Sequence, residues 1–194
     1  MRAPARVPYA LDVSDSPLAP SLLVAMPQLT DPNFHRSVVA LVEHDEEGTF
    51  GLVVNRPTSI LALELCSGLD IQWRGDSESL VSSGGPCQPD TGWVLIGDVD
   101  GFDASRVDDG IYFARSLETL RRVAEHPPEE ARIFLGYAGW GPGQLEEELA
   151  AGAWLVAPIT KGAVFSSDPD TLWEGVIRGL GVDPATLVHT SGVH

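Results

Sequence analysis

Residues 36–55 read RSVVALVEHDEEGTFGLVVN, which is two runs rich in valine and leucine joined by a short acidic turn. Branched aliphatic side chains favour strands, because they pack well on a pleated surface. Residues 45–48 supply the turn, and Gly48 can take the positive φ that a tight turn needs. The stretch therefore predicts an antiparallel β-hairpin with strands over 36–44 and 49–55.

Outside this hairpin, short apolar runs predict further strands, and capped periodic stretches predict helices. Ser116 and Asp168 precede the two clearest helices, in which apolar residues recur every three or four positions. A weaker helix is expected from Thr58 or Ser59 to Cys66, after a strand stopped by Pro57, and another over 144–151. The expected strands lie at 21–25, 80–82, 92–97, 111–114, 131–137 and 153–157, with a loop over 98–110.

Strands gather in the first half of the chain and alternate with helices in the second. This order predicts an α+β fold, with a mixed, largely antiparallel sheet flanked by helices. At 194 residues the chain has the length of one compact domain, and no linker divides it. We expect an extended N-terminal arm over the proline-bearing residues 1–17, then a single domain over 18–194 that ends in a short tail.

The charge balance excludes several function classes. Twelve lysines and arginines face 28 carboxylates, for a net charge of −16. Binding to phosphate backbones and anionic membranes depends on basic side chains, so direct nucleic-acid binding is disfavoured. Apolar runs fall short of the ~20 residues that span a bilayer, and no signal-peptide core is readable, so a cytoplasmic protein is expected. Cys66 and Cys87 are expected to be reduced thiols.

The familiar cofactor and metal motifs are incomplete. Residues 139–143 read GWGPG between a strand and a helix, but no P-loop lysine follows, and residues 146–148 are three glutamates that repel phosphate. The acidic stretch 98–103 has Phe102 and Asp103 where a calcium loop needs an oxygen ligand and glycine. The histidines are scattered. No cofactor and no metal site is predicted.

A catalytic function would require residues that are distant in the sequence to lie close together in the fold. Asp31, His35, His44 and Cys87 would serve a small hydrolase-like enzyme if the fold brought them into one pocket. The alternative is that histidines at strand ends are surface or capping residues. Sequence spacing alone does not decide between the two.

Taken together, several segments resemble the bacterial YqgE/AlgH family. The resemblance covers roughly residues 18 to 181, in the order expected for the family. The matching segments are LLVAMP at 22–27, Asp31, Phe34, RSVV at 36–39, EH at 43–44, GLVVNRP at 51–57, GGP at 84–86, YAGWGPGQLE at 137–146, WL at 154–155 and VF at 164–165.

The resemblance implies a single α+β domain in the cytoplasm, in a family of unsettled activity, some of whose members are labelled transcriptional regulators. It supplies no catalytic residues. It does supply candidate binding positions, and Cys87 departs from the family pattern, which usually has valine after Gly-Gly-Pro. These positions are Asn55, Arg56, Pro57, Gly84, Gly85, Pro86, Gly139, Trp140, Gly141, Pro142, Gly143 and Gln144.

Three hypotheses follow. The first is a non-enzymatic binding or regulatory protein, whose glycine-rich loops meet in one cleft and recognise an unknown protein or small-molecule partner. The second is a transcriptional regulator that contacts DNA directly, which lacks a readable helix-turn-helix or basic stripe, although Arg115, Arg121 and Arg122 lie close in sequence. The third is the hydrolase-like enzyme.

Overall fold

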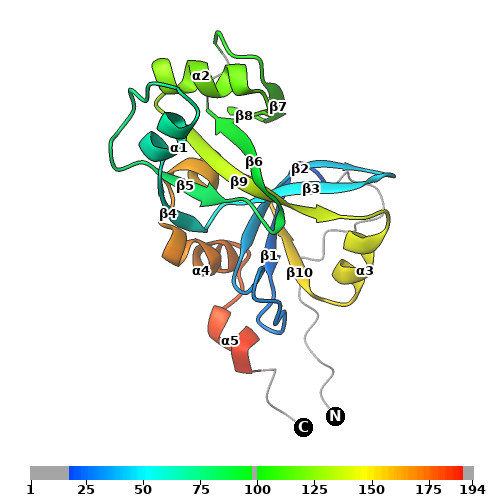
Figure 1. Cartoon of the computed structure of the whole chain (residues 1–194). Helices are drawn as coiled ribbons and strands as arrows, with labels where there is room; N and C mark the ends of the chain where they lie inside the picture. The colour runs from blue at the N-terminus through cyan, green and yellow to red at the C-terminus, as the bar shows by residue number, and fades with distance from the viewer. Residues whose placement is uncertain (1–17, 98–99, 190–194) are drawn as a thin grey trace, which may run out of the picture.

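One ten-stranded, largely antiparallel sheet carries the fold, which is a single α+β domain as predicted (Figure 1). The computed structural model describes residues 18–97 and 100–189, so the arm expected over 1–17 lies outside the described residues. Among the described residues, no helix is both long and apolar enough to cross a membrane.

The order of the main sheet is β10-β1-β2-β3-β9-β6-β8-β7, and β5 joins β4 to β9. The strands are β1 Ser21–Ala25, β2 Val38–Asp45, β3 Gly48–Val53, β4 Pro57–Leu61, β5 Leu80–Ser83, β6 Cys87–Ile96, β7 Ser105–Asp108, β8 Ile111–Ala114, β9 Ala131–Trp140 and β10 Trp154–Ala157. The helices are α1 Ala62–Gly68, α2 Leu117–Glu125, α3 Gln144–Ala150, the π-helix η1 Gly162–Ser166, α4 Pro169–Gly179 and α5 Pro184–His189.

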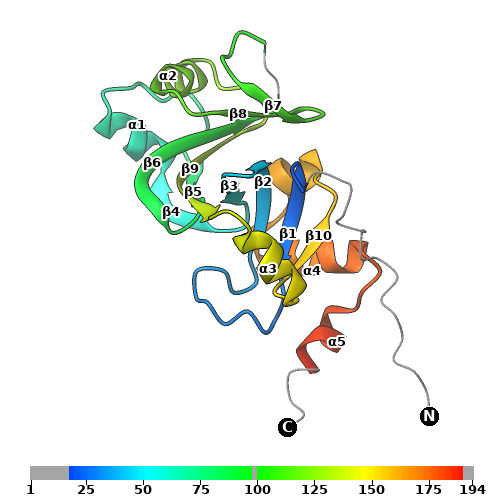
Figure 2. The same cartoon turned by 90° about the vertical axis from the view of Figure 1, so that its right-hand side faces the viewer.

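Strand β9 joins the two parts of the sheet. Its last residues, 138–140, pair with β3, whereas residues 131–137 pair with β6 on one edge and, at Phe134 and Leu135, with β5 on the other. The two views show β9 running from the part that carries α1 and α2 to the part that carries α3 and α4 (Figures 1 and 2). Side chains near residue 139 therefore lie where the two parts meet.

Alternation along the strands supplies the apolar layers. Leu22 of β1 packs with Trp173 of α4, whereas the next residue, Leu23, packs with Leu145 of α3. Helices α3 and α4 thus cover opposite faces of the sheet (Figure 2). A third apolar layer lies under α1 and α2 and contains Cys66 and Val123.

The central hairpin and both capped helices are confirmed. β2 and β3 pair antiparallel, and Gly48 has φ +146° at the turn. The Ser116 side chain accepts a hydrogen bond from Thr119 N, and the Asp168 side chain accepts one from Asp170 N. Local side-chain chemistry fixes these element boundaries.

Other boundaries were predicted wrongly. Residues 57–61 form β4 instead of a helix that follows a stop at Pro57, because Pro57 pairs with Ser82 and Thr58 Oγ1 donates to Val81 O. The helix begins only at Ala62. The stretch expected to be a loop at 98–110 contains β7, which pairs with β8. β6 and β9 are longer than predicted, so Gly139 and Trp140 belong to a strand.

Candidate functional site

A hollow of about 560 Å³ opens beside the turn of the β2–β3 hairpin. Its lining comes from three places: the hairpin, strand β6, and the end of β9 with the residue that follows it. These residues are Glu43, Asp45, Glu47, Gly48, Thr49, Phe50, Cys87, Gln88, Trp93, Tyr137, Gly139, Trp140 and Gly141. The hollow thus lies at the junction between the two parts of the sheet.

Packed aromatic rings form one wall of the hollow. The Phe50 ring stacks on Tyr137 at 4.9 Å between centroids and meets Trp93 edge-on at the same distance. Trp93 in turn stacks on the buried ring of Phe113 at 5.7 Å. Such ring pairs add to stability beyond the area they bury, so this wall is well fixed.

Carboxylates form the rim on the hairpin side. Glu43, Asp45 and Glu47 line the hollow, and none of its lining residues is a lysine or arginine. Glu43 pairs with Arg115 at 2.8 Å, while Asp45 Oδ1 accepts hydrogen bonds from the backbone N–H groups of Glu47 and Gly48. The rim is therefore negative, and the hairpin turn holds its shape through Asp45.

Gly139 keeps the hollow open. It pairs with Phe50 across the β3–β9 ladder, so a side chain at 139 would emerge on the same face as the Phe50 ring. A Cβ atom there would lie 2.9 Å from the Tyr137 ring and 3.7 Å from Cys87 Sγ. Gly141 differs, because a Cβ atom at that position would have only the Gln144 Oε1 atom, at 3.9 Å, as a neighbour.

Trp140 and Gln144 belong to a hydrogen-bond network centred on Glu148. Glu148 Oε2 accepts the indole N–H of Trp140 at 3.0 Å and that of Trp154 at 2.7 Å. Gln144 donates to Glu148 Oε1 at 2.9 Å and accepts from Gly141 N. The network ties α3 to β9 and β10, and it sets the backbone at the edge of the hollow.

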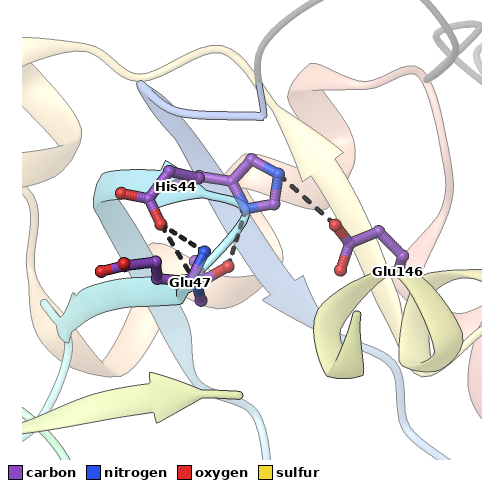
Figure 3. Close-up of polar contacts among 6 residues, drawn as sticks. His44, Glu47 and Glu146 are labelled. Atoms are coloured by element: carbon purple, nitrogen blue, oxygen red, sulfur yellow. Dashed lines mark hydrogen bonds and ion pairs between the residues drawn. The ribbon is translucent and has the colours of Figure 1, made fainter. Parts of the chain in front are cut away.

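His44 lies on the opposite face of the hairpin from Glu43 and Asp45, as alternation requires. Its Nδ1 atom is 2.7 Å from Thr49 Oγ1, and its Nε2 atom is 3.6 Å from Glu146 Oε1. Figure 3 shows the His44 ring turned toward Glu146 on α3, with Glu47 at the hairpin turn. His44 therefore links the hairpin to α3.

Asn55 and Arg56 hold the connection between β1 and β2. Asn55 Oδ1 accepts from Val38 N and its Nδ2 donates to Arg36 O, which continues the β-ladder through a side chain. Arg56 donates to the carbonyls of Pro32 and His35. Asn55, Arg56 and Pro57 are not among the residues that line the hollow.

Gly84 and Gly85 lie where two segments of backbone nearly touch. A Cβ atom on Gly84 would be 2.3 Å from Gly136 O, and one on Gly85 would be 2.3 Å from the Tyr137 carbonyl. The chain leaves this crossing through Pro86 and enters the hollow at Cys87. The small residues at 84–85 are thus required for packing, and they place the start of β6.

Two of the three predicted binding segments contribute to this region. Residues 139–141 line the hollow and 84–86 lead into it, whereas 55–57 clamp a different loop. The sequence reasoning missed the aromatic wall and the acidic rim. The acidic rim was predictable in part, because side chains alternate along a strand and Glu43 and Asp45, on either side of His44, must therefore lie on the same face.

The candidate catalytic side chains do not converge. Asp31 and His35 precede β2, whereas His44 lies near the far end of β2, about 20 Å from Val38 at ~3.3 Å per residue. Cys87 lines the hollow, on the face opposite His44. In the part of the chain that the structure describes, no group of three or more His, Cys, Asp and Glu side chains is placed to hold a metal ion.

Two of the three arginines considered for DNA contact make contacts within the molecule. Arg115 binds Glu43, and the Arg122 guanidinium lies 5.8 Å from the centre of the Phe102 ring. Both are therefore engaged within the molecule.

An AlgH-like family model (DUF179) matches residues 22–185, which is most of the chain. The chain belongs to the AlgH-like family. A UPF0301 protein of Myxococcus xanthus is 45% identical over 178 residues, which are 91% of this chain and 98% of that protein. A UPF0301 protein of Xanthomonas axonopodis pv. citri is 39% identical over 186 residues, covering 94% of this chain and 99% of its own.

Solved structures agree with this membership. The solution structure of AlgH from Pseudomonas aeruginosa superposes with a TM-score of 0.75 at 34% identity, over 93% of this chain and 97% of AlgH. A crystal structure of a Corynebacterium diphtheriae protein has a TM-score of 0.70 at 24% identity, over 92% and 94% of the two chains, and supports the fold alone. The resemblance to the YqgE/AlgH family is confirmed.

Proposed function

We propose that this AlgH-like protein is a non-enzymatic recognition module, which binds a partner or small ligand in the hollow between the β2–β3 hairpin, β6 and β9. The observation that carries the proposal is the lining itself. Gly139 leaves room in front of a fixed aromatic wall, and carboxylates gather on one rim. Concave sites with an apolar wall and a few polar groups are typical of ligand binding.

The proposal includes a regulatory role through a bound partner, exerted in the cytoplasm, where free thiols such as Cys66 and Cys87 persist. Direct DNA contact is disfavoured by the net charge of −16. A mobility-shift titration at low salt checks this point, because electrostatic attraction is greatest there. We expect no shifted band, and a salt-sensitive band would revive the DNA hypothesis.

A fragment screen followed by amide and indole NMR shifts tests the proposal. We expect hits to move the indole signal of Trp93, which lines the hollow beside Phe50, and to leave Trp173 unmoved, since its N–H donates to Ala25 O in the core. Gly139→Val should abolish these hits by filling the space beside Phe50. Gly92→Val is the matched control, because position 92 lies in β6 outside the lining of the hollow and a Cβ atom there has nothing within 4 Å.

Gly139→Val must first be shown to fold, by its thermal unfolding transition. If it does not fold, alkylation of Cys87 in the native protein fills the same space without a folding step. Hits that bind equally after both treatments, or that cluster around Trp173, would contradict the proposal.

A further inference from the structure

The charge of the hollow has one sign. Three carboxylates line it and no lysine or arginine does. Arg115 compensates Glu43, but among the described residues no ion pair compensates Asp45 or Glu47. Anionic ligands are therefore repelled, and a neutral apolar ligand would dehydrate carboxylates without replacing their water contacts.

The aromatic wall attracts positively charged ligands, as the carboxylates do. The faces of Phe, Tyr and Trp rings are negative, and they attract ammonium groups that lie within about 6 Å of the ring centre. Phe50, Trp93 and Tyr137 are all partly exposed, and each lines the hollow. Rings and carboxylates that line one hollow are the combination that recognises alkylated amines.

A further polar group in this wall is unused. The indole N–H of Trp93 is buried and has no hydrogen-bond partner among the described residues. Buried donors are normally paired. Because this N–H is closed to solvent, a ligand hydroxyl or a water would reach it only after the neighbouring rings shift.

We propose that the group recognised in the hollow is an organic cation, a protonated or alkylated amine, held between the aromatic wall and the acidic rim. This inference rests on the proposed function, because it names the ligand class of the same hollow. A volume of about 560 Å³ matches small-molecule sites, so a free amine is the expected source. A lysine side chain presented by a protein would offer the same chemistry.

A matched pair of probes separates charge from shape. Choline and its neutral carbon isostere, 3,3-dimethylbutan-1-ol, have nearly the same size and hydroxyl group. We expect choline to shift the Trp93 indole signal saturably and to bind at least about fivefold more tightly than the isostere. Blocked lysine amide is the third probe, and its binding relative to choline distinguishes a protein-borne amine from a free one.

Two matched variants test whether the carboxylates of the acidic rim strengthen choline binding. Glu47 lines the hollow and Glu46 does not, although the two are adjacent and exposed. Glu47→Gln should weaken choline binding about three- to tenfold, while Glu46→Gln, with the same change in net charge, should leave it within about twofold. Both substitutions lie in an exposed turn, so both variants should fold.

Two results would overturn the cation assignment. One is equal affinity for choline and the isostere at Trp93, which would leave the proposed recognition function standing with a neutral ligand. The other is a failure of both choline and blocked lysine to move the Trp93 indole signal. The recognition function itself fails only if no fragment of any charge binds in the hollow.

Discussion

Arg132 brings a positive charge into the middle of the sheet. Its guanidinium donates to Val54 O at 2.7 Å, to Val164 O at 2.9 Å and to Ser82 Oγ at 2.6 Å. Burial lowers the pKa of Arg132 to about 10, so the group still carries its charge at neutral pH. The Arg132 side chain therefore connects three places: strand β5, helix η1 and Val54, the residue that follows β3.

Arg132→Met should reduce the free energy of unfolding by about 3 kcal/mol, because three buried acceptors lose their donor. Urea denaturation at pH 7 measures the change. Arg178→Met is the control: Arg178 pairs with Glu174 on the surface of α4, and its loss should cost less than about 0.5 kcal/mol. Equal losses in the two variants would contradict the role assigned to Arg132.

The two cysteines should react at very different rates. Cys66 is fully buried, and burial raises the pKa of its thiol, so little reactive thiolate is present at pH 8. Cys87 is partly exposed in the hollow. Brief treatment of the native protein with N-ethylmaleimide should label Cys87 at least about tenfold faster, as read by peptide mass spectrometry. Faster labelling of Cys66 would show that the α1 layer opens.

Single residues were only partly predictable as site residues. Glycine was the guide, but glycine serves different purposes at different positions. At 84 it permits a backbone crossing, and at 139 it leaves a space. Because both demands select the same residue, the sequence alone could not separate packing from recognition.

At the scale of elements, capped helices are the most predictable. Ser116 caps α2, and its Oγ accepts from Thr119 N at 3.1 Å. Ser116→Ala should therefore lower the free energy of unfolding by about 1 kcal/mol in urea denaturation. Ser67 lies at an exposed position inside α1, and its side chain makes no hydrogen bond among the described residues. Ser67→Ala should therefore change the free energy of unfolding by less than about 0.5 kcal/mol. Equal changes in the two variants would contradict the capping role of Ser116.

Elements whose existence depends on a distant partner were missed. Residues 57–61 have a helical start signal at Thr58, but Thr58 Oγ1 donates to Val81 O across a strand pair instead. β7 likewise exists through its pairing with β8. Such pairings override local preference, since the ladder satisfies backbone groups that a lone segment leaves to water.

At the scale of the whole molecule, the close crossing of 84–85 over β9 holds the two parts of the sheet together. Gly84 N donates to Leu135 O, and Val53 N donates to Gly84 O, so one residue connects β9 to β3. The sequence predicted the sheet class but not this connection, because nothing local marks which strands become neighbours. The parallel β5–β9 pairing has the same origin.

Gly84→Ala should therefore destabilise the whole fold by more than about 3 kcal/mol, because the new methyl group would overlap Gly136 O. Gly175→Ala, inside α4 with nothing near the new methyl group, should instead stabilise the protein by about 0.5–1 kcal/mol. Thermal and urea unfolding of the two variants measure the predicted loss of stability in Gly84→Ala and the predicted gain in Gly175→Ala. A tolerated Gly84→Ala would mean that the crossing is looser than described.

The central claim is that recognition occurs in the hollow between the hairpin, β6 and β9. Its most direct test is the affinity of the strongest fragment hit, measured by titration calorimetry before and after alkylation of Cys87 in the folded protein. Cys87 Sγ lies 3.7 Å from the position that a Cβ atom would take at residue 139. A group attached to this sulfur is therefore expected to fill the hollow and abolish binding. Unchanged affinity in fully alkylated, folded protein would contradict this claim.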